Sequence, residues 1–350
     1  MTISSLLRCC LRALRRQYPI IAIILAYITL AALLAWLFGH TDRFSLHIYT
    51  DTYGVLIHLF SVVVVLGHVI YIMIWVRPDR LTLYILSSWK RFLIGSDRFL
   101  QGIILMLLLP LFMSSFTFMK AMIPVLMPYT WDPLLVYWDR WLHGGTEPWR
   151  LLAPLLHRPW LTSAINFAYN LWFFIMYGVF CWQAFDQRRP DLRMRYLLSF
   201  FLNWALIGTF AATLFSSVGP VYYHLVYGEP SPFAPLTAYL KEVSAIMPVW
   251  AVDVQEQLWA DYRSNTVGLG SGISAMPSMH LASTFLMTLL AFEYSRIAGW
   301  IAVFYTFVIF IGSIHLAWHY ALDGYVGIAM SWLVWQLAGR LAHPAEWQRT

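Results

Sequence analysis

The chain has 350 residues, of which 60% are hydrophobic and 11% are charged, whereas about a quarter of the residues in a typical soluble domain are charged. This composition excludes a soluble globular enzyme and predicts an all-α integral membrane protein. The net charge of +6 does not indicate nucleic-acid binding, because the basic residues are spread over short segments between apolar runs.

Eight apolar runs are long enough to be considered as transmembrane helices. They cover residues 19–39, 53–76, 99–118, 162–185, 196–217, 280–294, 298–315 and 320–338. Basic residues favour the cytoplasmic side of a membrane. If both termini are cytoplasmic, the cytoplasmic segments hold 16 of the 23 Lys and Arg residues, which supports this orientation. The basic segment 77–98 is then expected to be a cytoplasmic loop.

Two of the expected outer segments have features of their own. Residues 131–142 predict a short helix at the membrane surface, capped by Asp132 and with Pro133 at its first position. Asp132 and Asp139 share the face opposite its apolar residues, and a catalytic carboxylate pair is the alternative interpretation. The outer region 218–278 is too long for a simple connection, so we expect it to form a partly ordered cap over a site.

Two polar stretches lie at the borders of the last three apolar runs. One, SGISAMPSMH, ends in His280 and opens the sixth run; the other, HLAWHYALD, carries His315, His319 and Asp323 at intervals of four residues. Side chains four apart on a helix lie nearly above one another. Titratable groups close to a bilayer core are costly and are therefore candidates for function. The expected topology places His280, His319 and Asp323 at the outer face.

The spacing of these residues leaves three interpretations open. In the first, one histidine is a nucleophile oriented by the carboxylate, and the other donates a proton to the leaving group. In the second, His315, His319 and Asp323 are metal ligands, with His280 as a fourth. In the third, the residues form a satisfied structural network.

The segments AMPSMH and HYALD resemble the second and third motifs of the type 2 phosphatidic acid phosphatase superfamily, which read P-S-G-H and S-R-x5-H-x3-D. The residues of these two motifs are most similar to those of the branch that contains inositol phosphorylceramide synthase and its bacterial relatives. The resemblance implies a six-helix, phosphatase-like catalytic core over residues 99–340, preceded by two added helices within residues 1–98. It implies that His319 is the nucleophile, that Asp323 orients it, and that His280 acts first as acid and then as base. No metal or other cofactor is implied.

The chain departs from the pattern of this superfamily at the basic residues that hold phosphate. The first motif, K-x6-R-P, has no counterpart, and Ser313 stands where the third motif has arginine. Loss of these residues is a feature of the transferase-like branch and favours transfer to an alcohol over hydrolysis. The candidate phosphate-binding residues are Ser278, His315, Arg263, Tyr222 and Tyr223.

These observations predict an enzyme that cleaves a lipid phosphoester or diphosphate through a phosphohistidine, with transfer to an alcohol or to water. The expected substrate is a membrane lipid such as a phospholipid, a polyprenyl phosphate or a sphingolipid precursor. The expected location is a bacterial inner membrane, with the active site on the periplasmic face. The alternatives are a metal-dependent membrane hydrolase and a non-catalytic lipid carrier or transporter.

Overall fold

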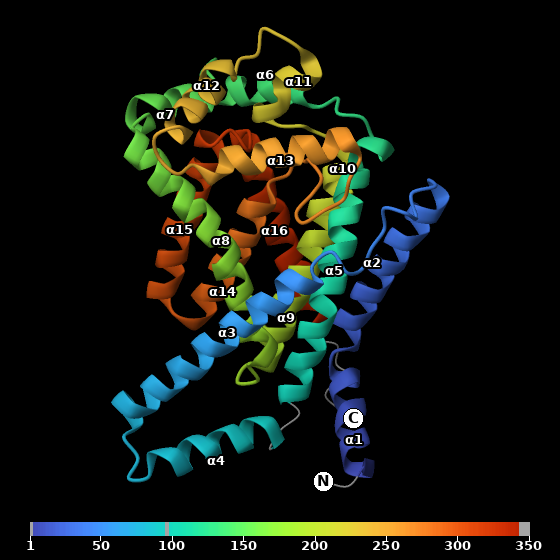
Figure 1. The fold of residues 1–350 in the computed structure, drawn as a ribbon, viewed down its shortest axis with the longest axis vertical. Coiled ribbons are helices and arrows are strands. Elements are labelled where there is room, and N and C mark those ends of the chain that lie inside the picture. The colour runs from blue at the N-terminus through green and yellow to red at the C-terminus, as the bar shows by residue number, and fades with distance from the viewer. Residues whose placement is uncertain (1–2, 95–97, 343–350) are drawn as a thin grey trace.

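The computed structural model describes residues 3–94 and 98–342. These residues form helices and no strands, which confirms the predicted all-α class. Figure 1 shows a bundle of long helices that run along the long axis of the molecule, with a layer of short helices across one end. We call this layer the cap; it consists of α6, α7, η3 and α11 to α13, whose bounds are given below.

The bundle is built around α14 (Met279–Tyr294), which packs against α8, α15, α16 and the stretch η2. The other long helices are α2 (Tyr18–Leu37), α5 (Arg98–Leu126), α8 (Pro159–Phe185), α9 (Pro190–Leu202), α15 (Arg296–His315) and α16 (Ala321–Leu341). Helix α9 continues through a π-helical stretch, η2 (Asn203–Ala211), into the short α10 (Ala212–Leu214). Such stretches are frequent at functional sites, and η2 contributes to the cavity described below.

Six helical segments in the described residues are long and apolar enough to cross a membrane, so the protein has the features of an integral membrane protein. They are Tyr18–Leu37, Thr52–Val76, Arg98–Leu126, Pro159–Phe185, Pro190–Leu214 and Arg296–His315. The predicted number of eight is not confirmed. Helix α14 has only 16 residues, about 24 Å of helix against a hydrocarbon core of about 30 Å. Helix α16 includes the polar residues Asp323, Ser331 and Gln336, which lower its mean hydropathy.

The N-terminal part contains α1 (Ile3–Arg16), α2, and α3 (Thr50–Tyr71), which continues into the π-helical η1 (Ile72–Val76). It also contains α4 (Leu81–Ile94), so the segment predicted as a loop between two spans is largely helical. Helix α4 has 14 residues, too few to span a bilayer, and it lies across the end of the molecule opposite the cap (Figure 1). The predicted boundary between residues 98 and 99 borders residues 95–97, which lie outside the described part.

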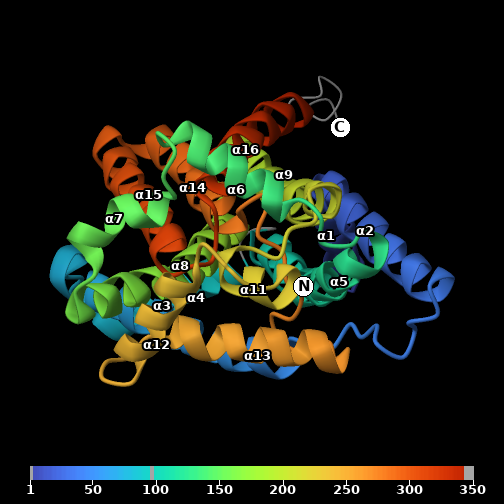
Figure 2. The same ribbon diagram turned by 90° about the horizontal axis from the view of Figure 1, so that it is seen from above.

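The two long segments that were expected on the outer side contain the helices of the cap. Its helices are α6 (Asp132–Leu142), α7 (Pro148–Leu156), η3 (Pro220–Tyr222), α11 (Tyr223–Tyr227), α12 (Ala234–Ser244) and α13 (Trp250–Ser264). Seen from above, α12 and α13 run along one edge of the molecule and α11 lies between them and α6 (Figure 2). The predicted surface helix is α6, but Asp132 does not cap it. Trp131 is the N-cap residue and makes no side-chain cap bond, and the Asp132 carboxylate binds other segments of the chain.

Candidate active site

The site begins at the turn between α15 and α16, where the chain reverses. Helix α15 ends at His315, and Ala317 has a φ of 60°, in the left-handed region. The carbonyl of Ser313 accepts hydrogen bonds from the N–H groups of Trp318 and His319, both at 3.0 Å. His315, His319 and Asp323 therefore do not lie on one continuous helix. The expected stacking of His315 on His319 is absent, and the two side chains have different surroundings.

The imidazole of His319 is held through its Nδ1 atom, which lies 2.8 Å from the carbonyl oxygen of Ala275 and 3.3 Å from Oδ2 of Asp323. A carbonyl oxygen only accepts hydrogen bonds, so Nδ1 carries a proton, and in the neutral imidazole Nε2 is the nitrogen that keeps its lone pair. Oδ2 of Asp323 also accepts the N–H of Tyr320 at 3.0 Å. Asp323, in the first turn of α16, thus fixes the backbone next to His319 as well as its ring.

The imidazole of His280 lies among aromatic rings at the start of α14. Its centroid is 4.2 Å from that of Trp172, 4.5 Å from that of Tyr169 and 5.8 Å from that of His319. Trp172 is fixed by a hydrogen bond of 2.9 Å from Nε1 to the hydroxyl of Ser283. Neither ring nitrogen of His280 has a hydrogen-bond partner among the described residues. Its ring is thus positioned by contacts with aromatic rings.

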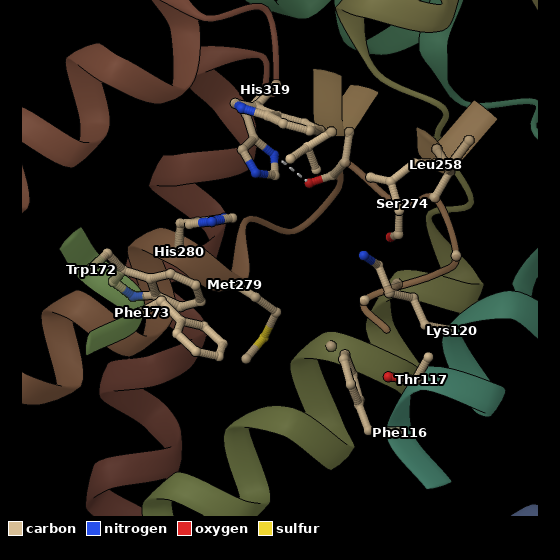
Figure 3. Close-up of a pocket in the computed structure, with 18 of the residues that line it drawn as sticks. Phe116, Thr117, Lys120, Trp172, Phe173, Leu258, Ser274, Met279, His280 and His319 are labelled. Carbon is tan, nitrogen blue, oxygen red and sulfur yellow. Dashed lines mark hydrogen bonds between the residues drawn. The ribbon is translucent and has the colours of Figure 1, made fainter. Parts of the chain in front are cut away.

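Both histidines line a cavity of about 440 Å³, a size typical of small-molecule sites. Its walls are mainly aromatic and aliphatic, from α5, α8, η2, the cap and the loop before α14. Figure 3 shows His319 above His280 on one side of the cavity, and Lys120 and Ser274 on the opposite side. The aromatic lining residues include Tyr49, Phe116, Tyr169, Trp172, Phe173, Phe174, Tyr177 and Trp204. The site therefore combines an apolar chamber with a few polar groups.

Lys120 is a functional candidate that the sequence analysis missed. Helix α5 continues to Leu126 instead of ending near residue 118, and this places Lys120 on the cavity wall. No hydrogen bond or ion pair of its amine occurs in residues 3–94 and 98–342. The loop before α14 approaches this point at Gly272, whose φ is 91° and where a Cβ would lie 2.7 Å from the backbone nitrogen of Ala121. A single lysine inside an apolar run was the available signal.

Two of the predicted phosphate-binding residues lie at or beside the site, although each has a protein partner. Tyr222 lines the cavity, and its hydroxyl donates to the carbonyl of Gln255 at 2.9 Å. Ser278 is the N-cap of α14, where its hydroxyl accepts the N–H of Leu281 at 3.4 Å. The N–H of Ser278 donates to the carbonyl of Asp323 at 3.0 Å. Ser278 therefore ties the helix of His280 to the helix of Asp323.

The other three predicted phosphate-binding residues do not line this cavity. The Nε2 atom of His315 is hydrogen-bonded to the hydroxyl of Thr162 at 2.9 Å, between α15 and α8. Arg263, near the end of α13, lines a separate cavity of about 330 Å³. Tyr223 lies in α11 of the cap. In the described part of the chain, no group of three or more His, Cys, Asp or Glu residues is arranged to hold a metal ion, so the ligand set with His315 is not assembled.

The structure is thus a bundle of apolar helices in which two imidazoles and a lysine line one cavity, with the carboxylate of Asp323 bound to one of the imidazoles. A family model described as the PAP2 superfamily matches residues 133–337, more than half of the chain, and the chain belongs to this superfamily. Its members are generally phosphatases, so the protein is, in general terms, a phosphatase-type lipid phosphoesterase. The comparison with curated proteins and the comparison with solved structures each gave no match.

Proposed function

We propose that the protein cleaves a phosphoester or diphosphate of a membrane lipid through a phosphohistidine formed on His319. The observation that carries this proposal is the bond from Nδ1 of His319 to the carbonyl of Ala275, which makes Nε2 the unprotonated nitrogen of the neutral ring. A histidine nucleophile needs this tautomer. His280 and Lys120 line the same cavity, and the amine of Lys120 has no hydrogen bond or ion pair within the described residues. His280 supplies a proton-transfer group and Lys120 a positive charge.

Each step of the proposed reaction uses one of these groups. Nε2 of His319 attacks the phosphorus atom, the bond from phosphorus to the leaving oxygen breaks, and protonated His280 gives its proton to that oxygen. The acceptor hydroxyl then attacks the phosphohistidine, gives its proton to His280, and the P–N bond breaks to restore His319. Asp323 stabilises the positive charge on the His319 ring, and Lys120 balances the charge on the phosphate oxygens.

We further propose that the acceptor is an alcohol, which makes the protein a lipid phosphotransferase; transfer to water is the alternative. The sequences of the AMPSMH and HYALD motifs support this, because they are most similar to the branch that contains inositol phosphorylceramide synthase. Ser313 in place of a phosphate-binding arginine is a further feature of that branch. The mainly apolar walls of the cavity agree with a lipid donor, since they supply few polar partners for water.

We propose that the protein lies in a bacterial inner membrane, with the cavity opening on the periplasmic side. The cap covers the end of the bundle that holds the site, while Arg188, Arg189 and Arg296 lie at the turns of the opposite end (Figure 1). Positive residues favour the cytoplasmic side. Impermeant labelling of a cysteine introduced at residue 191 in intact cells would contradict this orientation.

The test uses the full-length protein, purified in detergent, with a panel of phospholipid, polyprenyl diphosphate and sphingolipid donors in ¹⁸O-labelled water. Lipid mass spectrometry follows the donors with and without an added alcohol-bearing lipid. Transfer produces a new phospholipid without ¹⁸O, whereas hydrolysis places ¹⁸O in the released phosphate. We expect turnover that survives EDTA and disappears in His319→Ala.

Three outcomes of this test would contradict the proposal. Activity lost in EDTA and restored by zinc would favour the metal-dependent hydrolase. Binding of lipids without cleavage would favour the carrier. Turnover that persists in His319→Ala would remove the phosphohistidine.

A further inference from the structure

Helix α6 of the cap presents two buried carboxylates that the proposed reaction does not use. Asp132 and Asp139 are seven residues apart, which is two helical turns, so they lie on one face. Their residues are 0% and 4% exposed. Burial of a carboxylate is costly unless hydrogen bonds compensate for the lost water. The hydrogen-bond partners of both carboxylates therefore identify the segments that this face of α6 binds.

Asp139 binds the first turn of α16. Its Oδ2 accepts the N–H of Ala321 at 3.2 Å, and its Oδ1 accepts the N–H of Leu322 at 3.0 Å. These amides belong to the helix N-terminus, where N–H groups have no partner within the helix and a negative charge is favourable. Both lie between His319 and Asp323 in the chain. A carboxylate from the cap thus caps the helix that carries Asp323.

Asp132 binds the same segment one residue earlier and also binds a second loop. Its Oδ1 accepts the hydroxyl of Tyr320 at 2.9 Å. The two carboxylate oxygens also accept the hydroxyl of Ser217 at 2.8 Å and the N–H groups of Val218 and Gly219 at 2.9 and 2.8 Å. Asp132 therefore connects the segment after His319 to the loop 217–219.

The loop 217–219 leads back to the catalytic histidine. The carbonyl of Ser217 accepts the N–H of Ala275 at 3.0 Å, and the carbonyl of Ala275 is the acceptor for Nδ1 of His319. At Gly219, where φ is 85°, a Cβ would lie 2.9 Å from the Cβ of Ala275 and 3.0 Å from the carbonyl oxygen of Trp318. Asp132 is therefore linked, through Ser217, to the Ala275 carbonyl that accepts the His319 proton. Asp132 and Asp139 together bind residues 320–322, which follow His319 in the chain.

From these contacts we propose that Asp132 and Asp139 are positioning residues, which clamp the segment 319–323 and the Ala275 carbonyl so that Nε2 of His319 faces the substrate phosphorus. The inference rests on the proposed function, because it assumes that His319 is the reacting group. It gives α6 a role beyond that of a surface helix: one face of α6 fixes the geometry of the nucleophile.

The test compares Asp132→Asn and Asp139→Asn with Asp253→Asn, which changes an exposed aspartate of α13. Steady-state kinetics per folded molecule and hydrogen exchange of segment 319–323, followed by mass spectrometry, are measured in detergent. Because a misplacement of about 1 Å can cost about 10²-fold in rate, we expect kcat to fall by about 10- to 100-fold in both α6 variants. KM should stay within about threefold, since neither residue contacts substrate, and exchange of segment 319–323 should be faster. Asp253→Asn should match the wild type.

Tyr320→Phe is a milder variant that serves if Asp132→Asn does not fold. It removes only the hydroxyl that donates to Asp132, and it should also lower kcat and leave KM unchanged. Faster exchange with unchanged kcat would overturn the positioning role, and unchanged exchange would overturn the clamp. A wild type that cleaves no lipid phosphate would instead refute the proposed function, while the exchange comparison would still decide whether the clamp exists.

Discussion

The Nδ1 atom of His319 is closer to the backbone carbonyl of Ala275, at 2.8 Å, than to the carboxylate of Asp323, at 3.3 Å. The tautomer of the imidazole is therefore fixed by two acceptors, of which the nearer is part of the backbone. A backbone carbonyl is not removed by a side-chain substitution, so the tautomer of His319 depends less on the carboxylate of Asp323.

A first prediction follows for Asp323→Asn. In a triad whose carboxylate alone fixes the tautomer, the equivalent change costs about 10⁴-fold in kcat. Here Ala275 keeps Nδ1 protonated, so we expect a smaller loss, about 10²-fold, from the missing charge stabilisation. Steady-state kinetics with one lipid donor measure it. A loss of about 10⁴-fold would show that the carboxylate, and not the carbonyl, sets the tautomer.

A second prediction concerns Lys120 as the phosphate ligand. A charged hydrogen bond contributes about 1.5–3 kcal/mol, so Lys120→Ala should lower kcat/KM by at least about tenfold for donors that differ only in their tails. Lys120→Arg should retain part of the activity because it keeps the charge. Lys241→Ala, at an exposed position of α12, is the matched control and should match the wild type. Equal kcat/KM for Lys120→Ala and wild type would remove Lys120 from the site.

Several features of the fold and site were predictable because they depend on local sequence. Apolar runs gave the approximate positions of the long helices, and the distribution of Lys and Arg placed His280 and His319 at the same end of the bundle. The spacing of HYALD predicted the pair of His319 and Asp323, and they are in contact. A short interval of this kind constrains two side chains even when a turn replaces the helix.

The features that were not predictable depend on contacts between distant segments. The length of α5, and hence the place of Lys120, became evident only where the loop at Gly272 packs on it. The left-handed turn at Ala317 separates His315 from His319, and no local signal marks an alanine for that conformation. The Asp139 carboxylate of α6 binds amides that are 182 and 183 residues away in the chain. The sequence predicted that Asp132 and Asp139 share one face of the helix, but it did not predict which groups they bind.

A third prediction tests the packing of α16 against the start of α14. A Cβ at Gly327 would lie 2.6 Å from the carbonyl oxygen of Ser278, the N-cap residue of the helix that carries His280, whereas a Cβ at Gly178 of α8 would meet nothing within 4 Å. Both glycines are inside helices, where alanine is intrinsically favoured by about 1 kcal/mol. Gly178→Ala should therefore leave the Tm unchanged or raise it, while Gly327→Ala should lower both Tm and activity. Thermal unfolding in detergent compares them, and equal Tm changes would refute the close approach.

A fourth prediction concerns pH and Asp139. Burial raises the pKa of this carboxyl to about 6 from an ordinary value of 3.8, against the opposing effect of the N–H groups of Ala321 and Leu322. The nearby charged or titratable groups are Asp323, His143, at 3.8 Å from the carboxylate, and Tyr325. The folded protein binds this proton more tightly than the unfolded chain, so stability falls as pH rises from about 4 to 6, by up to about 3 kcal/mol.

Asp139→Asn does not titrate, so comparing it with wild type isolates this effect. The Tm of the wild type should decrease relative to that of the variant between about pH 4 and 6, and the difference should be constant above about pH 7. Thermal unfolding of both proteins in detergent from pH 4 to 8 provides the measurement. A difference in Tm that does not change with pH would show that the pKa of Asp139 is not raised.

The most direct test of the central claim is to trap the phosphorylated enzyme. Wild type, His319→Ala and His280→Ala are mixed with a ³²P-labelled aryl phosphate and denatured in alkali, where phosphohistidine survives. We expect label on the His319 peptide of the wild type and of His280→Ala, because an aryl leaving group needs little protonation, and no label on His319→Ala. Label that persists in His319→Ala, or its absence from both other proteins during turnover, would contradict the account.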